Sequence, residues 1–483
     1  MVPGRGGRIE PLGIKALISP WPGRGRDPPC FLRRKQALIF GAKGQPSRCF
    51  RRAPLRPPRP DRSGLSVFQN SKLMRNMKDF DRIAKKITTV LFLSQSLSSA
   101  GFIAAFTVNA IVGVDLSGQK AMAGVPGGLY VAGQACGSLV WGLSMERIGR
   151  RSVLALGQIA GVFGSAIAAA AVIDRSFAFF LVGLFLVGMA RSAVDLGRFV
   201  AAEVHLPEKR GRAIANVVLG STVGAIFGPL LVGPMGYIAA RFGYPDLSGT
   251  YMAGAGVLAF AALLIFGGLR PEPRDIGREL AEAYPGSTPH QTTRSLGDII
   301  RHPGVVVAIV TMAFSQMVMV VPMSITSVHM KDHEHALTAV SLVISAHTLG
   351  MYAFSVFSGR MTDRWGRGRV IVLGSILMIL SCLMAAPSIA LFPLTVALFL
   401  LGLGWNFAYV AGSTLLADQL APGERAKTQG FNDLLLNLSS GISQIGSGVV
   451  YAAGGYGIMG LAAAAMAAVP LGLAIWWQVR GRR

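Results

Sequence analysis

The chain has 483 residues, of which 52% are hydrophobic and only 14% are charged. Soluble domains carry about 25% charged residues, because their surfaces face water. A chain of this length with so little charge cannot cover a water-soluble globule, so the composition excludes an ordinary soluble protein and indicates a membrane protein. The net charge of +24 would suggest nucleic-acid binding on a soluble surface. It is concentrated at the beginning of the chain, however, and we expect no nucleic-acid partner.

The first segment, residues 1–79, is rich in Pro, Gly and Arg and holds 18 Lys and Arg residues against 4 Asp and Glu residues. It shows neither helical periodicity nor a long apolar run, so we predict a disordered basic extension. It lacks the apolar core of a secretory signal peptide. The scarcity of acidic residues leaves an organellar transit peptide open. The alternative is that the natural protein begins near Met74 or Met77.

Twelve apolar runs of about 20 residues follow, the length that crosses a bilayer as a helix. Six of them predict an N-terminal bundle over residues 80–270: 87–112, 122–143, 152–173, 177–202, 213–237 and 251–269. Six more predict a C-terminal bundle with a short basic tail over residues 303–483: 305–328, 337–358, 370–386, 392–416, 431–451 and 458–477. The sequence thus predicts an all-α integral membrane protein of twelve transmembrane helices.

The connection between the bundles, residues 271–302, is the longest and most charged loop after the first segment. We expect it on the cytoplasmic side. Within it, residues 274–284 form either a short surface helix or a solvated linker.

Basic residues orient the predicted helices. From Arg75 onward, the segments on the side of the N-terminus hold 25 Lys and Arg residues, whereas the loops on the other side hold four, which are Lys120, Arg175, Arg241 and Lys331. Cytoplasmic loops collect Lys and Arg. We therefore predict a multi-pass protein of the cytoplasmic membrane with both termini in the cytoplasm, surrounded by lipid.

The two halves of the chain repeat each other at an offset near 216 residues. After the second run the chain reads GLSMERIGRR, and after the eighth it reads GRMTDRWGRG. The matching residues are Gly142, Glu146, Arg147, Gly149 and Arg150 in the first half and Gly359, Asp363, Arg364, Gly366 and Arg367 in the second. A second match, at the ends of the fourth and tenth runs, aligns Glu203 with Asp418. Two six-helix repeats make the predicted bundles pseudo-symmetric, an architecture of transporters whose substrate site lies near the midplane.

This doubled loop resembles the signature of the major facilitator superfamily, and the resemblance covers roughly residues 78–483. Glu146 departs from the usual Asp, and Ser144 stands where Leu is common. The resemblance implies secondary active transport by alternating access, with the acidic residue latching the two halves on the cytoplasmic side. Glu146 would then dock near the start of the eleventh run, around Gly430 to Asp433. Alternatively, the loop is only a topology signal.

The fifth run contains glycines spaced by four, followed by a proline: Gly220, Gly224, Gly228 and Pro229. Small residues at that spacing let helix backbones approach closely in lipid, and the proline bends the helix. The pattern resembles a fifth-helix motif of exporters in the same superfamily. Ordinary close packing is the alternative interpretation.

Three charged residues lie inside the fourth run: Arg191, Asp195 and Arg198. Spacings of four and three place them on one helical face, which we expect to line a central cavity. Charges at membrane depth are costly and usually functional. One hypothesis is that Asp195 exchanges a proton and that Arg191 or Arg198 binds an anionic group of the substrate. The alternative is a structural ion pair.

Side-chain amides in other runs are further candidates for the substrate and proton pathway: Gln95, Asn109, Gln134, Asn406, Asn437 and Gln444. Trp405 and Tyr409 flank Asn406 in the tenth run, and Ser440 joins the polar stripe of the eleventh. Amides hydrogen-bond many solutes, but they also hold membrane helices together.

We expect proton-coupled efflux of amphiphilic or drug-like solutes by an antiporter. The sequence contains no Walker A signature, so we do not expect ATP to be the energy source. We expect a monomer with no cofactor, no bound metal and no enzymatic activity. The alternatives are uptake of a small metabolite and a membrane protein without transport activity. Export of a soft metal is a further alternative, based on Met312, Met317, Met319 and Met323 and on His329, His333 and His335.

Overall fold

The structure is a computed structural model that describes residues 64–206, 209–283, 294–421 and 424–480. Within these residues every regular element is a helix, which confirms the predicted all-α class. Most of the predicted basic extension, residues 1–63, lies outside the described residues. The described residues from Val67 onward form one compact unit.

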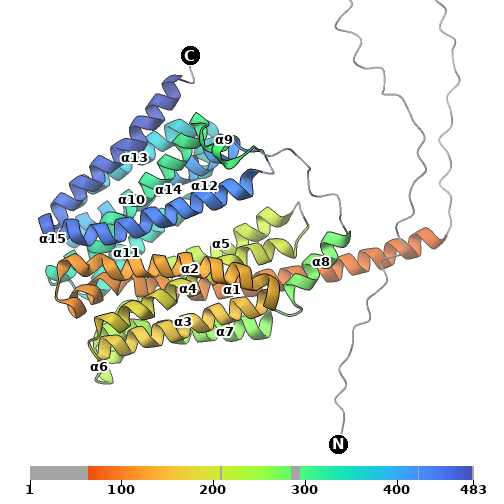
Figure 1. The fold of residues 1–483 in the computed structure, drawn as a ribbon, viewed down its shortest axis with the longest axis horizontal. Helices are drawn as coiled ribbons and strands as arrows, with labels where there is room; N and C mark the ends of the chain where they lie inside the picture. Colours follow the sequence, from red (N-terminus) through yellow and green to blue (C-terminus); the bar gives the residue numbers. More distant parts are fainter. Residues whose placement is uncertain (1–63, 207–208, 284–293, 422–423, 481–483) are drawn as a thin grey trace, which may run out of the picture. The chain divides into compact units, whose positions relative to one another are not determined.

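The helices follow the two predicted halves (Figure 1). Those of the N-terminal bundle are α1 (Gly64–Ser117), η2 (Lys120–Gly124), α2 (Val125–Ile148), α3 (Arg150–Ile173), α4 (Phe177–Glu203), α5 (Arg210–Phe227), η4 (Pro229–Leu231), α6 (Val232–Arg241) and α7 (Asp246–Gly268). The connection contributes α8 (Pro273–Ala283) and α9 (Leu296–Ile300). The C-terminal bundle consists of α10 (Pro303–Asp332), α11 (Leu337–Tyr352), α12 (Ser355–Trp365), α13 (Arg367–Ala385), α14 (Leu391–Asp418) and α15 (Arg425–Arg480).

Ten helical stretches among the described residues are long and apolar enough to cross a membrane. The last of them, Lys427–Val479, contains two crossings, because Gly455 interrupts its helical backbone with a φ of 69°, a conformation that favours glycine. Helix α2 is not among the ten, but its 24 residues have the length of a crossing. Counted in this way, the helices agree with the twelve predicted ones.

Three boundaries differ from the prediction. Helix α1 begins at Gly64, so residues 64–79 are helical although they were expected to be disordered; this stretch contains no proline and several good helix formers. The fifth run is divided where Pro229 begins the 3₁₀ turn η4. The eighth run is divided between α11 and α12, at residues 353–354. Helix α8 agrees with the surface-helix interpretation of the connection.

The fifth-run glycines lie on the face of α5 that packs against α1. A Cβ atom at Gly220 would come 2.6 Å from the carbonyl oxygen of Phe92, and one at Gly228 would come 2.6 Å from that of Ala100. Any larger side chain at these positions would push the two helices apart. The motif therefore joins two helices of the same bundle.

The outward faces of both bundles are apolar. Large hydrophobic side chains such as Leu143, Phe163, Leu263 and Phe392 expose more than half of their area. Patches of this kind are rare on soluble proteins. Lipid is the medium that suits them, in keeping with helices of membrane-spanning length.

We call the end of the helices that carries Gly149 and Gly366 the basic end, and the opposite end, with η2 and Gly455, the far end. The two bundles meet at the far end, where η2 packs against α10 and α15, and α2 packs against α15. Lys120 Nζ of η2 lies 2.5 Å from Asp332 Oδ2 of α10, and the Tyr451 hydroxyl donates to the same oxygen at 2.7 Å.

Midway along the helices, α5 packs against α11, where the Thr348 hydroxyl donates to the carbonyl oxygen of Ala225 at 3.1 Å. Closer to the basic end, Arg198 and Asp433 form an ion pair between the bundles at 3.7 Å. The helices of the two groups converge toward the far end and separate toward α8 and α9 (Figure 1). The structure is thus closed at the far end and open at the basic end.

Closure at the far end depends on glycine at position 124. A Cβ atom there would overlap with the carbonyl group of Gln444 on α15, so we expect Gly124→Ala to separate the far ends. Spin labels at positions 119 and 331, both exposed in the native chain, would report this as a longer mean distance in electron double resonance. The labels are placed in a chain whose four cysteines are replaced by serine.

Gly446→Ala is the matched control, because a Cβ atom at that position of α15 would meet nothing within 4 Å. An unchanged distance distribution in Gly124→Ala would contradict the role of this contact in closure.

Candidate functional site

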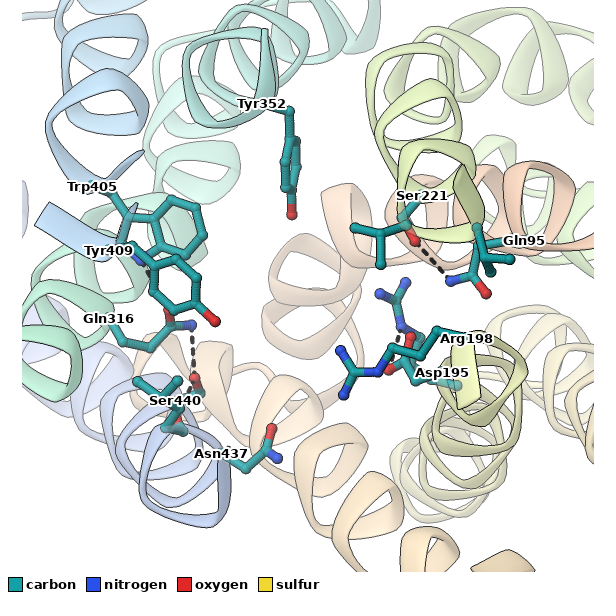
Figure 2. A pocket seen from close by; sticks show the side chains of 14 residues that line it. Gln95, Asp195, Arg198, Ser221, Gln316, Tyr352, Trp405, Tyr409, Asn437 and Ser440 are labelled. Atoms are coloured by element: carbon teal, nitrogen blue, oxygen red, sulfur yellow. Dashed lines mark hydrogen bonds and ion pairs between the residues drawn. The ribbon is translucent and has the colours of Figure 1, made fainter. Parts of the chain in front are cut away.

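A cavity of about 320 Å³ lies between the two bundles, near the middle of the helices. Helices α1, α4 and α5 form one wall, and α10, α11, α14 and α15 form the other (Figure 2). The lining residues are Gln95, Arg191, Asp195, Arg198, Val217, Val218, Ser221, Gln316, Tyr352, Trp405, Tyr409, Leu436, Asn437 and Ser440. Binding sites for small molecules have volumes of roughly 300–1,000 Å³, so this cavity suits a small ligand.

The charged face of α4 forms the centre of the first wall. Arg191, Asp195 and Arg198 all line the cavity, on the shared face that their spacing predicts. Arg191 Nε donates to Asp195 Oδ2 at 3.1 Å, and Gln134 Nε2 of α2 donates to the same oxygen at 3.2 Å. The arginine also lies over the ring of Phe102, 5.7 Å from its centroid. Asp195 therefore has a cationic and a neutral partner within its own bundle.

Arg198 is farther from its carboxylate partner than Arg191 is from Asp195. Its NH2 atom lies 3.7 Å from Asp433 Oδ2 of α15, on the opposite bundle. This distance exceeds the usual 2.7–3.2 Å of an N–H···O hydrogen bond. Its Nε atom is buried without a hydrogen-bond partner among the described residues. Figure 2 shows the side chain of Arg198 extending from its wall into the cavity.

The second wall is aromatic. Trp405 and Tyr409, one turn apart on α14, stack with ring centroids 4.8 Å apart and an angle of 17° between the rings. Tyr352 of α11 meets Trp405 edge to face at 6.4 Å. Figure 2 shows these three rings across the cavity from Arg198 and Asp195.

Hydrogen bonds hold the polar side chains of both walls in place. On the first wall, Gln95 Nε2 of α1 donates to Ser221 Oγ of α5 at 2.7 Å. On the second, Trp405 Nε1 donates to Gln316 Oε1 at 3.0 Å, and Gln316 Nε2 donates to Ser440 Oγ at 2.9 Å. These bonds fix the lining before any ligand binds.

Some predicted amides lie elsewhere. Asn109 accepts a hydrogen bond from the buried Tyr251 hydroxyl at 2.8 Å, inside the N-terminal bundle. Asn406 is buried and donates to the carbonyl oxygen of Met351 at 2.6 Å. Gln444 is buried at the far end, where it faces Gly127 of the other bundle. These three residues join helices in this structure, whereas Gln95 and Asn437 line the cavity and Gln134 contacts it through Asp195.

The doubled loop has the same geometry in both halves. Gly149 and Gly366 each have a φ of 90° and separate two helices, a turn that a residue with a side chain would strain. Arg150 donates from Nε to Glu203 at 3.0 Å and from NH2 to Glu146 at 2.9 Å.

In the second half, Arg367 pairs with Asp418 at 2.8 Å and with Asp363 at 3.6 Å. Glu203 and Asp418, which are aligned in the repeat, thus have the same role. Each accepts a hydrogen bond from the loop arginine of its own half. Arg147 and Arg364 lie next to these networks in their loops, and a Cβ atom at Gly142 or Gly359 would meet nothing within 4 Å.

The expected docking of Glu146 near Gly430 to Asp433 is not present in this structure. The Glu146 side chain is 71% exposed and pairs with Arg150 of its own loop, and a Cβ atom at Gly430 would meet nothing within 4 Å. The physical reason is the separation of the bundles at the basic end, which leaves the start of α15 out of reach.

Helix α8 covers the first loop. Glu272, just before it, accepts hydrogen bonds from the backbone N–H groups of Arg150 and Arg151 at 2.6 and 3.2 Å. These are the unpaired amides at the start of α3, where the helix dipole favours a carboxylate. Ile276 and Leu280 of α8 are buried. The connection therefore begins as a packed part of the N-terminal bundle.

The connection ends in a similar way on the C-terminal bundle. Arg294 binds Glu424 through Nε and NH2, both at 2.8 Å. Hydrogen bonding to the Arg294 guanidinium lowers the pKa of the Glu424 carboxyl to about 2, so the pair remains charged at neutral pH. Both ends of the connection are thereby fixed to the bundles that they follow and precede.

The residues behind the soft-metal hypothesis have other partners. Met312, Met319 and Met323 are buried within the C-terminal bundle. Nε2 of His329 and of His335 contact the carbonyl oxygens of Ser388 and Ile389 at 3.0 and 2.9 Å. Among the described residues, no group of three or more His, Cys, Asp or Glu side chains is arranged to hold a metal ion.

Sequence reasoning missed three polar lining residues, which are Ser221, Gln316 and Tyr352. Single hydroxyl and amide groups within apolar runs give little signal.

The sequence matches the family described as the Major Facilitator Superfamily over residues 91–331 and 320–483. It is 34% identical to the uncharacterized MFS-type transporter YddS of Bacillus subtilis over 402 residues, which cover 82% of this chain and 92% of that protein. It is 30% identical to the riboflavin transporter RfnT of Brucella anthropi over 359 residues, which cover 73% of this chain and 86% of that one.

The fold is similar to that of a bacterial homologue of the human lysosomal transporter Spinster, solved in an inward-facing and unoccupied conformation. The TM-score is 0.61 at 15% sequence identity, and the match covers 82% of this chain and 95% of the other.

The Arg150 network should stabilise the N-terminal bundle. Arg150→Gln would leave Glu203 without its cationic partner, and hydrogen bonds to charged groups contribute about 1.5–3 kcal/mol each. We expect a lower midpoint of thermal unfolding in detergent, followed by intrinsic fluorescence. Arg147→Gln, which changes an exposed arginine of the same loop, should leave the midpoint nearly unchanged. Equal midpoints for both variants would refute a stabilising role for Arg150.

Proposed function

Because this chain belongs to the major facilitator superfamily of multi-pass membrane transporters, we propose that it moves a small solute through the cavity between its bundles by alternating access. The observation that supports this most directly is the cavity itself, which both bundles line near the middle of the helices. A site in that position can be exposed to either side of the membrane when the bundles rock against each other.

We propose that the basic end faces the cytoplasm, because cytoplasmic loops collect Lys and Arg. The structure then represents a cytoplasm-facing state. In the opposite state the basic ends would meet, and the exposed carboxylate of Glu146 would come close to the start of α15, where the positive end of the helix dipole favours an anion. The latch role of Glu146 belongs to that state.

We propose that transport is driven by protons and exports amphiphilic or drug-like solutes. Asp195 supports the proton coupling, because it is a carboxylate at membrane depth that lines the cavity. The mixture of aromatic, charged and amide groups in the lining suits a solute with both apolar and polar parts. We propose export rather than uptake because the glycine pattern of the fifth helix resembles that of exporters.

Proton-coupled uptake of a small metabolite is the second candidate. It is supported by the 30% identity to a riboflavin transporter over most of both chains. The two candidates use the same cavity and the same movement, and they differ in the direction of net flux relative to the proton gradient.

Transport in proteoliposomes tests the proposal. The purified chain is reconstituted with an imposed pH gradient and offered riboflavin and a panel of amphiphilic anions, cations and neutral compounds. We expect at least one compound to move against its own gradient while protons move down theirs, and the sign of the proton flux separates antiport from symport. Failure of every compound to show either net transport or exchange between the two sides would contradict a transport function.

Asp195→Asn separates coupling from binding. The amide retains the shape and an acceptor oxygen for Arg191, but it cannot exchange a proton. We expect the variant to catalyse solute exchange across the membrane and to lose accumulation driven by a pH gradient. Asp115→Asn, at an exposed pair with Arg175 near the far end, is the matched control and should accumulate solute normally. Undiminished proton-driven accumulation by Asp195→Asn would exclude Asp195 as the coupling group.

A further inference from the structure

The two walls of the cavity differ in chemistry. The wall formed by α4 presents guanidinium and carboxylate groups, whereas the wall formed by α11 and α14 presents three aromatic rings. Figure 2 shows the labelled side chains of the two walls facing each other. A ligand that fills the cavity must satisfy both surfaces at once.

Of the two arginines, Arg198 is the one available to a ligand. Arg191 is already paired with Asp195 by a hydrogen bond of 3.1 Å. Arg198 has the long 3.7 Å contact with Asp433 and lies over the ring of Phe199, 4.8 Å from its centroid, and its side chain is 38% exposed. A guanidinium binds a carboxylate through two parallel hydrogen bonds, a geometry that a distant aspartate does not provide. An anionic group at Arg198 would therefore make contacts that Asp433 does not provide.

The aromatic wall favours a ligand with a flat ring. Trp405 and Tyr409 lie nearly parallel, and the hydrogen bond from Trp405 to Gln316 holds the indole in place. Aromatic rings prefer offset-stacked or edge-to-face neighbours at centroid distances of about 4.5–7 Å. A flat ring can adopt such an arrangement against Tyr409 or beneath Tyr352, whereas a puckered aliphatic ring of the same size makes fewer contacts.

The cavity volume indicates the size of the ligand. About 320 Å³ lies at the lower end of the range for small-molecule sites. It suits a ligand of one or two fused rings with one charged substituent.

We propose that the substrate is a small planar aromatic carboxylate, whose carboxylate binds Arg198 and whose ring lies against the Trp405–Tyr409 stack. This inference rests on the proposed transport function and specifies the substrate class of the same cavity. Because Arg198 belongs to one bundle and the aromatic stack to the other, such a ligand contacts both bundles and replaces Asp433 as the partner of Arg198.

Binding of four probes to the full-length chain in lipid nanodiscs, measured by calorimetry, tests the substrate class. 2-Naphthoate has the ring and the charge, cyclohexanecarboxylate has the charge alone, and 2-naphthalenemethanol has the ring alone. 2-Naphthylmethylamine has the ring with the opposite charge. We expect 2-naphthoate to bind at least about tenfold more tightly than any of the others, since charged hydrogen bonds and ring contacts both contribute. Tightest binding of the amine or of cyclohexanecarboxylate would overturn the proposal.

Variants assign the two contacts. Arg198→Gln should weaken binding of 2-naphthoate about tenfold or more, the loss of one charged hydrogen-bonded pair, and should change binding of 2-naphthalenemethanol less than about twofold. Retained binding of the alcohol shows that the cavity is still folded. Arg198→Lys keeps the charge but loses the planar fork, so we expect an intermediate loss. Unchanged 2-naphthoate binding in Arg198→Gln would overturn the assignment.

On the other wall, Tyr409→Leu should weaken 2-naphthoate binding about threefold to tenfold, the range of one aromatic contact, while Tyr409→Phe keeps the ring and should lose clearly less. Arg175→Gln, which alters an exposed arginine far from the cavity, is the control for a general loss of positive charge. Equal losses in Tyr409→Leu and Tyr409→Phe would argue against stacking.

The transport assay separates failure of this inference from failure of the proposed function. If proteoliposomes move other members of the panel while 2-naphthoate neither binds nor moves, the chain is a transporter and the substrate class is wrong. If 2-naphthoate binds through Arg198 and Tyr409 but no compound crosses the membrane, the ligand class is supported and the transport function is wrong.

Discussion

Each charge held between the helices needs a partner inside the protein, because the outward faces of the bundles are apolar and face lipid rather than water. Within the N-terminal bundle this requirement is met locally. Arg150 is paired with Glu203, and Arg191 is paired with Asp195. Both partners of each pair belong to the same bundle. These pairs can therefore remain intact whatever the position of the other bundle, as the proposed alternating access requires.

Among the described residues, two ion pairs join the bundles, and their lengths differ. Lys120 and Asp332 lie 2.5 Å apart at the far end, and Tyr451 donates to the same carboxylate. Arg198 and Asp433 are 3.7 Å apart, closer to the basic end. Alternating access requires contacts at one end to break as contacts at the other end form. The short pair at the closed end and the long pair toward the open end are what this requirement predicts for a state that is open on one side.

The fold could be predicted from the sequence further than the site could. Apolar runs and basic loops identify the helices and their order, because both signals are local in the chain. The repeat around Gly149 and Gly366 shows which helices of the two halves correspond. The shared face of Arg191, Asp195 and Arg198 is also local, since it follows from helical spacing.

The second wall of the cavity depends instead on which faces of α11 and α14 turn inward, and spacing alone does not determine that rotation. Asn406 illustrates the difficulty, because it sits next to Trp405 in the chain but points into the bundle, where it donates to Met351. The break between α11 and α12 was missed for a related reason, since no proline or charge marks it in the sequence. Tyr352 ends α11 at this break and lines the cavity.

The contact between Arg198 and Asp433 would link the proposed ligand binding to the proposed movement of the bundles. Asp433 is 36% exposed, so water can solvate its carboxylate if an anion takes Arg198 from it. The exchange then costs little at the aspartate, and Arg198 gains a bidentate partner. In the closed position of the basic end, the two bundles would approach and water would leave. An unpaired Asp433 would then be costly to bury, and in the proposed mechanism the ligand's contacts with both bundles must offset this cost when the loaded site closes. A ligand alters a conformational equilibrium only through a difference in affinity between the two states, and contacts with both bundles would provide one inside the cavity.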